Sequence, residues 1–116
     1  MNRQDLTLLT DLYELTMMQG YYEQEQNETV VFDVFFRQNP CNNGYSVCAG
    51  LAQVIDYIKN LNFTYEDVDY LRSLKIFSED FLQYLSGFHF SGDIYAIPEG
   101  TVVFPKEPLL KVVAPI

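Results

Sequence analysis

The sequence has few residues of the kinds that hold metal ions, disulfide frameworks or nucleic acids. Its 116 residues include one histidine, two cysteines and seven basic residues against sixteen acidic ones, a formal net charge of −9. Cys41 and Cys48 do not have the spacing of a zinc site or a disulfide framework. We therefore expect both to be reduced thiols, with Cys48 buried. The acidic surface would repel nucleic acid and anionic membranes, so neither is expected as a partner.

Long hydrophobic runs and familiar catalytic motifs are also missing. No apolar run approaches the roughly 20 residues that span a bilayer, and the N-terminus lacks the charged and then apolar pattern of a signal peptide. These two absences predict a cytoplasmic protein. No glycine-rich phosphate loop or nucleophile-elbow serine occurs, and His89, between two phenylalanines, reads as a structural or surface residue. The basic residues are scattered singly, so they cannot by themselves cage a polyphosphate.

What the sequence does contain is the pattern of one α+β domain. With 48% hydrophobic residues it can form a single core. Apolar periodicity predicts a helix over residues 8–21 stopped by Gly20. A short β-branched and aromatic run at residues 30–36 predicts a central strand, and an apolar stripe that includes Val47 predicts a helix over residues 45–60. Within that helix, Gly50 is expected to permit close approach of another backbone.

The remainder predicts two further helices and then strands. One helix begins with a capping box at Thr64, and the next begins at Ser78, buries Phe81, Leu82 and Leu85, and stops at Gly87. Strand-like segments near residues 90–96, 101–104 and 109–113 predict an antiparallel meander. The expected fold is therefore α+β, with helices packed on one face of a mixed, mostly antiparallel sheet.

Two places stand out as candidate binding residues. Asp11 and Tyr13 lie at the start of the first helix, where a side-chain oxygen can cap free amides and an acidic group suits the helix dipole. One interpretation is purely structural, with Asp11 capping the helix and Tyr13 buried in the core with its hydroxyl bonded. Arg37, at the end of the first strand, is usually a surface charge at such a position, but its planar fork would suit a phosphate.

The chain as a whole resembles the N-terminal domain of the nicotinate phosphoribosyltransferase family. Each matching segment is a weak motif alone, but six of them occur in order and together cover the chain. They are LTDLY at residues 9–13, FDVFFRQNP at 32–40, the segment from Gly44-Tyr45 to Ala49-Gly50-Leu51, FTYED at 63–67, YLRSL at 70–74, and GDIYAIPEG at 92–100 with residues 105–115 after it.

This resemblance implies an activity and a division of labour. Family members join nicotinate to the ribose of 5-phosphoribosyl 1-diphosphate with coupled ATP hydrolysis, and they use a phosphorylated histidine. Their N-terminal α+β domain packs on a C-terminal type II phosphoribosyltransferase α/β barrel in a homodimer with shared, composite sites. The resemblance places Tyr13 against the pyridine ring, Asp11 beside it and Arg37 on the 5-phosphate.

The resemblance assigns most of the chemistry to the barrel, and the barrel is absent from these 116 residues. We therefore interpret residues 1–116 as one truncated domain. The resemblance implies no catalytic residue and no metal ligand in this chain. ATP and Mg²⁺ would serve the parent enzyme and would not bind this chain alone, so the isolated chain is expected to be inactive. Two alternatives stay open: a stand-alone, non-catalytic structural or interaction module, and a related transferase acting on nicotinamide or quinolinate.

Overall fold

The structure, a computed structural model, describes residues 6–116, and these form two compact units. The first unit contains residues 6–27 and 57–90, and the second contains residues 28–56 and 91–116. The chain therefore passes from one unit to the other three times. One of these passages falls inside the helix α2 (Leu51–Asn60).

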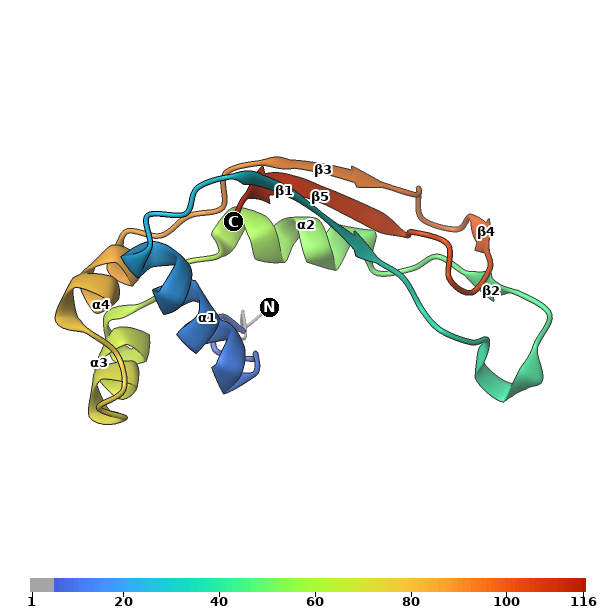
Figure 1. Cartoon of the computed structure of the whole chain (residues 1–116). Coiled ribbons are helices and arrows are strands. Elements are labelled where there is room, and N and C mark those ends of the chain that lie inside the picture. The colour runs from blue at the N-terminus through green and yellow to red at the C-terminus, as the bar shows by residue number, and fades with distance from the viewer. Residues whose placement is uncertain (1–5) are drawn as a thin grey trace. The chain divides into compact units, whose positions relative to one another are not determined.

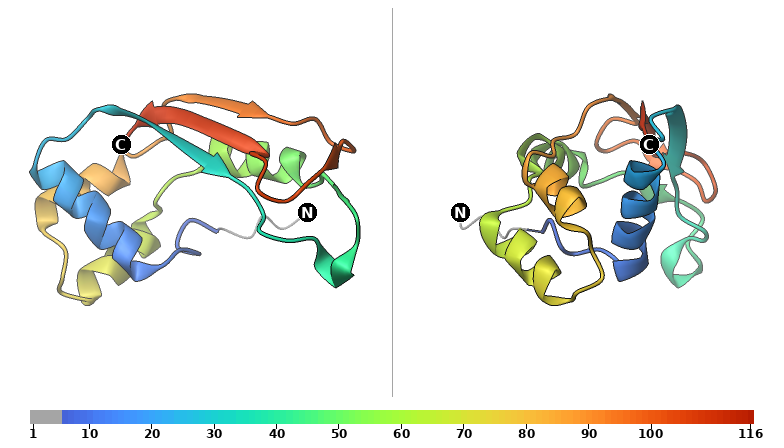
Figure 2. Two further views of the ribbon diagram at one scale, coloured as in Figure 1. Left: turned by 45° about the vertical axis from the view of Figure 1, so that its right-hand side comes forward. Right: turned by 60° about the vertical axis from the view of Figure 1, so that its left-hand side comes forward.

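The first unit consists of α1 (Leu12–Glu23), α3 (Tyr65–Ser73) and α4 (Glu79–Ser86), which lie beside one another (Figures 1 and 2). The three residues predicted to be buried in the last helix are fully buried in α4 and form the centre of the core. Each such aliphatic or aromatic side chain contributes about 1.5–3 kcal/mol through burial. The core cluster is made of Leu15, Phe63, Val68, Leu71, Phe81, Leu82 and Leu85.

The predicted starts of α3 and α4 are confirmed. At Thr64 the hydroxyl oxygen accepts a hydrogen bond from the Asp67 amide (3.2 Å), and the Asp67 carboxylate accepts one from the Thr64 amide (2.8 Å), which completes a capping box. Ser78 Oγ accepts from the Phe81 amide (3.3 Å), and α4 ends with Gly87 as its C-cap residue. Such helix starts can be predicted from the sequence because the capping partners lie within three residues of each other.

The predicted bounds of the first helix were wrong. α1 begins at Leu12, and it continues through Gly20 for three more residues, to Glu23. The left-handed conformation occurs instead at Glu25, with φ of 51°. The extra turn carries Tyr22, whose ring packs 5.8 Å from that of Phe81, so tertiary packing outweighs the weak helix propensity of glycine.

A three-stranded antiparallel sheet forms the centre of the second unit. Its order is β1 (Thr29–Val34), β5 (Leu110–Pro115) and β3 (Asp93–Ala96), so β5 lies in the middle (Figure 1). The expectation of a central first strand was therefore wrong. β1 is apolar on most positions, yet it is an edge strand, and its Phe32 is 61% exposed. An apolar run indicates a strand without showing how many neighbours it has.

The predicted meander was also wrong, because the short strand between β3 and β5 leaves their sheet. β4 (Val102–Val103) pairs with β2 (Ser46–Val47) in a separate antiparallel ladder. Backbone hydrogen bonds from the Cys48 amide to the Thr101 carbonyl and from the Gly100 amide to the Cys48 carbonyl, both 2.8 Å, extend this ladder. Cys48 is buried, as predicted.

The helix predicted over residues 45–60 was too long, because α2 begins only at Leu51 and residues 46–47 are in β2. Gly50 has φ of +104°, which is incompatible with a helix and ends the extended segment. No atom lies within 4 Å of the place where a Cβ would stand on Gly50, so its expected role in close backbone approach was wrong. With helices α1 to α4 and two antiparallel ladders described among residues 6–116, the α+β class is confirmed.

Candidate functional site

Tyr13 is an exposed aromatic residue on the first turn of α1. Its side chain is 60% exposed, whereas Leu15 is only 4% exposed. Two residues correspond to a rotation of about 200° around a helix, so these side chains lie on nearly opposite faces. Among residues 6–116 the Tyr13 hydroxyl has no hydrogen-bond partner and the ring has no aromatic neighbour. The structural interpretation of Tyr13 as a core residue was therefore wrong.

Asp11 occupies the N-cap position of α1 but does not cap it with its side chain. Its carbonyl oxygen accepts the Glu14 amide (3.1 Å), while its carboxylate makes no cap hydrogen bond. The neighbouring Thr10 hydroxyl donates to the Glu14 carboxylate instead. The expected capping by the Asp11 side chain was wrong. The structure therefore leaves the Asp11 carboxylate and the Tyr13 ring exposed at the same end of α1.

The face of α1 that carries Tyr13 remains apolar along the helix. Met17, one turn further along α1, is half exposed. It lines one side of a hollow of about 510 Å³. A helix with apolar residues on both sides is normally covered on both sides. This face can therefore bury a flat apolar ring or another protein surface. The hollow is lined by Met17, Gly20, Tyr21, Gln24 and Gln26.

Arg37 belongs to the second unit and follows β1 closely. Its guanidinium is exposed and makes no ion pair or hydrogen bond with any residue that the structure describes. Its backbone, however, is anchored, because the Phe36 carbonyl accepts the Lys106 amide (2.8 Å) and the Val34 carbonyl accepts the Leu109 amide (2.7 Å). Arg37 therefore presents a free cationic fork on a fixed backbone, an arrangement suited to an anion. Asp11 and Tyr13, in contrast, belong to the first unit.

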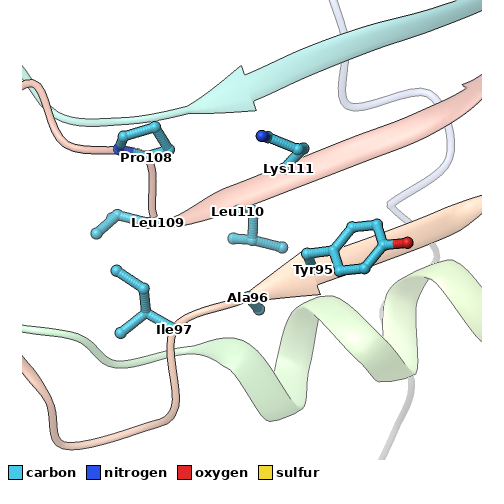
Figure 3. Close-up of a pocket in the computed structure, with 7 residues that line it drawn as sticks. All are labelled: Tyr95, Ala96, Ile97, Pro108, Leu109, Leu110 and Lys111. Atoms are coloured by element: carbon cyan, nitrogen blue, oxygen red, sulfur yellow. The ribbon is translucent and has the colours of Figure 1, made fainter.

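A second hollow, of about 460 Å³, lies at the ends of β3 and β5 (Figure 3). Tyr95 from β3 and Lys111 from β5 are register partners there and supply a phenol and an ammonium group to a mainly aliphatic surface. Sequence reasoning missed this hollow. The available signal was that Tyr95 and Ile97, like Leu109 and Lys111, alternate onto one face of paired strands. None of the predicted binding residues lines it.

Two side-chain hydrogen bonds were also not predicted. Ser46 Oγ donates to Asn39 Oδ1 (2.9 Å), and the Glu99 carboxylate accepts from the Gly50 amide (2.8 Å). The first closes the loop that follows Arg37, and the second fixes the start of α2. The partners are 7 and 49 residues apart in the chain, so no local capping or turn signal could have found them.

Within residues 6–116 no three histidine, cysteine, aspartate or glutamate side chains come close enough together to hold a metal ion. His89 is exposed, and its ring nitrogen lies 3.3 Å from the Gly87 carbonyl oxygen.

No helix among the described residues has both the length and the apolar character needed to cross a membrane. This finding agrees with the absence of long apolar runs in the sequence.

Residues 8–116 match a family model described as the nicotinate phosphoribosyltransferase N-terminal domain. The match covers the helix that carries Asp11 and Tyr13 and the strand that precedes Arg37. The chain belongs to this family of N-terminal domains.

Individual proteins agree with the family match. Over 109 residues the chain is 47% identical to nicotinate phosphoribosyltransferase pncB2 of Mycobacterium tuberculosis, covering 94% of this chain and 24% of that protein. It is 45% identical to nicotinate phosphoribosyltransferase 1 of Arabidopsis thaliana, covering 94% of this chain and 20% of that protein. The crystal structure of human nicotinic acid phosphoribosyltransferase matches with a TM-score of 0.80 at 30% identity, covering 91% of this chain and 22% of that one. The chain thus spans about a quarter or less of these relatives.

Proposed function

We propose that this chain contributes substrate-binding residues to a nicotinate phosphoribosyltransferase. The reaction joins nicotinate to the ribose of 5-phosphoribosyl 1-diphosphate and releases nicotinate mononucleotide and diphosphate, the first step from nicotinate towards NAD. The observation that carries the proposal is the exposed ring of Tyr13 on a helix whose opposite face is in the core. Membership of the N-terminal domain family supports it.

Tyr13 is proposed to bind the pyridine ring of nicotinate. A flat heteroaromatic ring loses apolar surface to water when it stacks on a tyrosine, and offset or edge contacts between rings add about 0.5–1.5 kcal/mol. The Tyr13 ring is free for such a contact, because no described side chain stacks on it. Asp11 lies at the same helix end, where its unbonded carboxylate can accept hydrogen bonds from a bound sugar hydroxyl.

Arg37 is proposed to hold the 5-phosphate of the second substrate. Its five N–H donors match phosphate oxygens in a bidentate geometry, and such charge-assisted bonds are stronger than neutral ones. With a net charge of −9, the surface as a whole repels polyanions. A phosphate must therefore be bound by individual cationic side chains. An exposed arginine without an internal ion pair is available for this contact.

The remaining machinery is proposed to lie outside these 116 residues. It comprises the phosphorylated histidine of a cytoplasmic, ATP-dependent enzyme, the contacts to the nicotinate carboxylate and most of the diphosphate site. These would be carried by a barrel in a homodimer that shares its sites between subunits. Because the barrel is proposed to carry these groups, the chain alone is proposed to be inactive. The names of the relatives favour nicotinate over nicotinamide or quinolinate as the substrate.

The test is a chimera in which this chain replaces the 109 aligned residues of the Mycobacterium tuberculosis relative. We expect it to form nicotinate mononucleotide. Tyr13→Ala should lower kcat/KM for nicotinate about ten-fold, the loss of roughly 1.4 kcal/mol of ring contact, and Tyr13→Phe should restore it. Tyr70→Ala is the matched control, because Tyr70 is 57% exposed on α3 of the same unit.

Two results would contradict the proposal. One is a folded chimera that forms no nicotinate mononucleotide. The other is a Tyr13→Ala chimera as efficient as the parent one. Thermal unfolding of each variant shows that the compared proteins are folded.

A further inference from the structure

We propose that Asn39 and Ser46 are positioning residues for Arg37. The inference rests on the proposed phosphate-binding role of Arg37 and extends it to two side chains that contact no substrate. All three residues belong to the second unit and therefore lie in one compact body.

The backbone before Arg37 is held by the turn that precedes β5. Lys106 adopts a left-handed conformation with φ of 66°, and its amide donates to the carbonyl oxygen of Phe36, the residue just before Arg37. The Leu109 amide bonds Val34 in the same way. Arg37 is therefore fixed on its N-terminal side by the extension of the β1–β5 ladder.

The backbone after Arg37 has no ladder to hold it. Residues 40–42 form a 3-10 turn, in which Cys41 and Asn42 have φ of 55° and 56°. Left-handed conformations at two consecutive residues other than glycine are unfavourable and persist only where surrounding contacts enforce them.

The Asn39–Ser46 hydrogen bond is the contact that closes this loop. The Ser46 hydroxyl donates to Asn39 Oδ1 at 2.9 Å, and the pair is partly buried. Ser46 is itself fixed in β2, where it is the register partner of Val103 in β4, a residue only 2% exposed. The bond thus connects the segment two residues after Arg37 to a rigid ladder. With Lys106 on one side and Ser46 on the other, the Arg37 backbone is anchored at both ends.

Anchoring an exposed arginine has a functional consequence. Binding a phosphate costs less free energy when the cationic group is already ordered, because less conformational entropy is lost. Removing the Asn39–Ser46 bond should therefore weaken binding of the phosphate-bearing substrate and leave the chemical step and nicotinate binding unchanged.

The first experiment measures backbone order in this chain by ¹⁵N relaxation. In the wild-type chain we expect a rigid Arg37 amide, with an order parameter of about 0.85, and in Ser46→Ala a value below about 0.6. Ser46→Thr keeps the hydroxyl donor and should restore rigidity. Thr101→Ala is the matched control, because it removes another hydroxyl hydrogen bond of the same unit, to the Pro98 carbonyl (2.8 Å), and should leave Arg37 rigid. Equal order at Arg37 in the wild-type chain and Ser46→Ala would overturn the proposal.

The second experiment measures kinetics in the active chimera. Ser46→Ala and Asn39→Ala should each raise KM for 5-phosphoribosyl 1-diphosphate about five-fold, the effect of one ordinary hydrogen bond. The double variant should show no further increase, because both changes remove the same bond. kcat and KM for nicotinate should stay within two-fold of the parent values, a difference of about 0.4 kcal/mol. An unchanged KM for 5-phosphoribosyl 1-diphosphate in Ser46→Ala would also overturn the proposal.

The two proposals fail in different ways. If Arg37→Ala leaves KM for 5-phosphoribosyl 1-diphosphate unchanged, the phosphate role of Arg37 is wrong, whereas the relaxation data still decide whether Ser46 orders it. If Arg37→Ala raises this KM and Ser46→Ala does not, the phosphate role stands and the positioning role is wrong.

Discussion

At the scale of single residues, exposure separates the side chains of α1 that hold the fold from those free to bind. Leu15 and Tyr13 lie on nearly opposite faces of α1, but helical spacing alone does not show which face meets the core. Both faces are apolar, so periodicity alone left the buried and exposed interpretations of Tyr13 open. Only the packing of α1 against α4 distinguishes the two interpretations, and these helices are far apart in the sequence.

Substitutions on the two faces of α1 should differ in their effect on stability. Leu15→Ala should lower the free energy of unfolding by about 2–5 kcal/mol, because it leaves a cavity in a closed core. Tyr13→Ala should change it by less than about 0.5 kcal/mol, as expected of an exposed residue. Urea denaturation of the two variants measures both values. Equal destabilisation would show that Tyr13 is a core residue after all.

Gly92 is a glycine that the packing requires. A Cβ at this position would stand 2.6 Å from Ala114 Cβ and 2.7 Å from the Val113 carbonyl oxygen. Gly92→Ala should therefore destabilise the second unit by about 1–3 kcal/mol through overpacking. Gly44→Ala is the control, since nothing lies within 4 Å of its Cβ position. The Tm of each variant tests this, and a Gly92→Ala protein as stable as Gly44→Ala would contradict the register at β5.

At the scale of elements, features that depend on partners a few residues apart could be predicted from the sequence. Features that depend on contacts between distant segments could not. The capping box at Thr64 and the start of α4 at Ser78 depend on partners three residues away, and both predictions are confirmed. The pairing of β2 with β4 joins segments more than 50 residues apart, and the two-residue strands are too short to show an alternating pattern. For the same reason the start of α2 was placed six residues too early.

The start of α2 should depend on Glu99. Its carboxylate accepts from the amides of Gly50 (2.8 Å) and Ala52 (3.5 Å), which have no partner within the helix. Glu99→Ala should therefore cost about 1 kcal/mol, as the loss of a helix cap does. Glu107→Ala removes a nearby glutamate that makes no hydrogen bond with the described residues. Urea denaturation should show a loss for the first variant only, and equal stability of the two would argue against the cap.

Thr64 offers a second test at the same scale. Thr64→Ala should lower the free energy of unfolding by about 1 kcal/mol, because the Asp67 amide loses its acceptor. Thr64→Ser keeps the hydroxyl and should recover most of this loss. If serine were no better than alanine, the contribution of Thr64 would come from its methyl group and not from the capping box.

At the scale of the whole molecule, the α+β class and the family were predictable because they depend on the ordered set of segments and not on any one boundary. Shifted helix ends and an exchanged strand order do not change that set. The candidate residues were predictable only in part. Asp11, Tyr13 and Arg37 could be named from the resemblance, while the anchoring of Arg37 by Ser46 depends on a contact that no local pattern shows.

The proposed role of this chain is to supply Tyr13 to a transferase site completed elsewhere. The most direct measurement mixes this chain with the Mycobacterium tuberculosis relative shortened by its 109 aligned residues and follows nicotinate mononucleotide formation. We expect no activity from either part alone, activity from the mixture, and a large loss when the chain carries Tyr13→Ala but not Tyr70→Ala. Activity of the chain alone, or an equally active mixture with Tyr13→Ala, would contradict it.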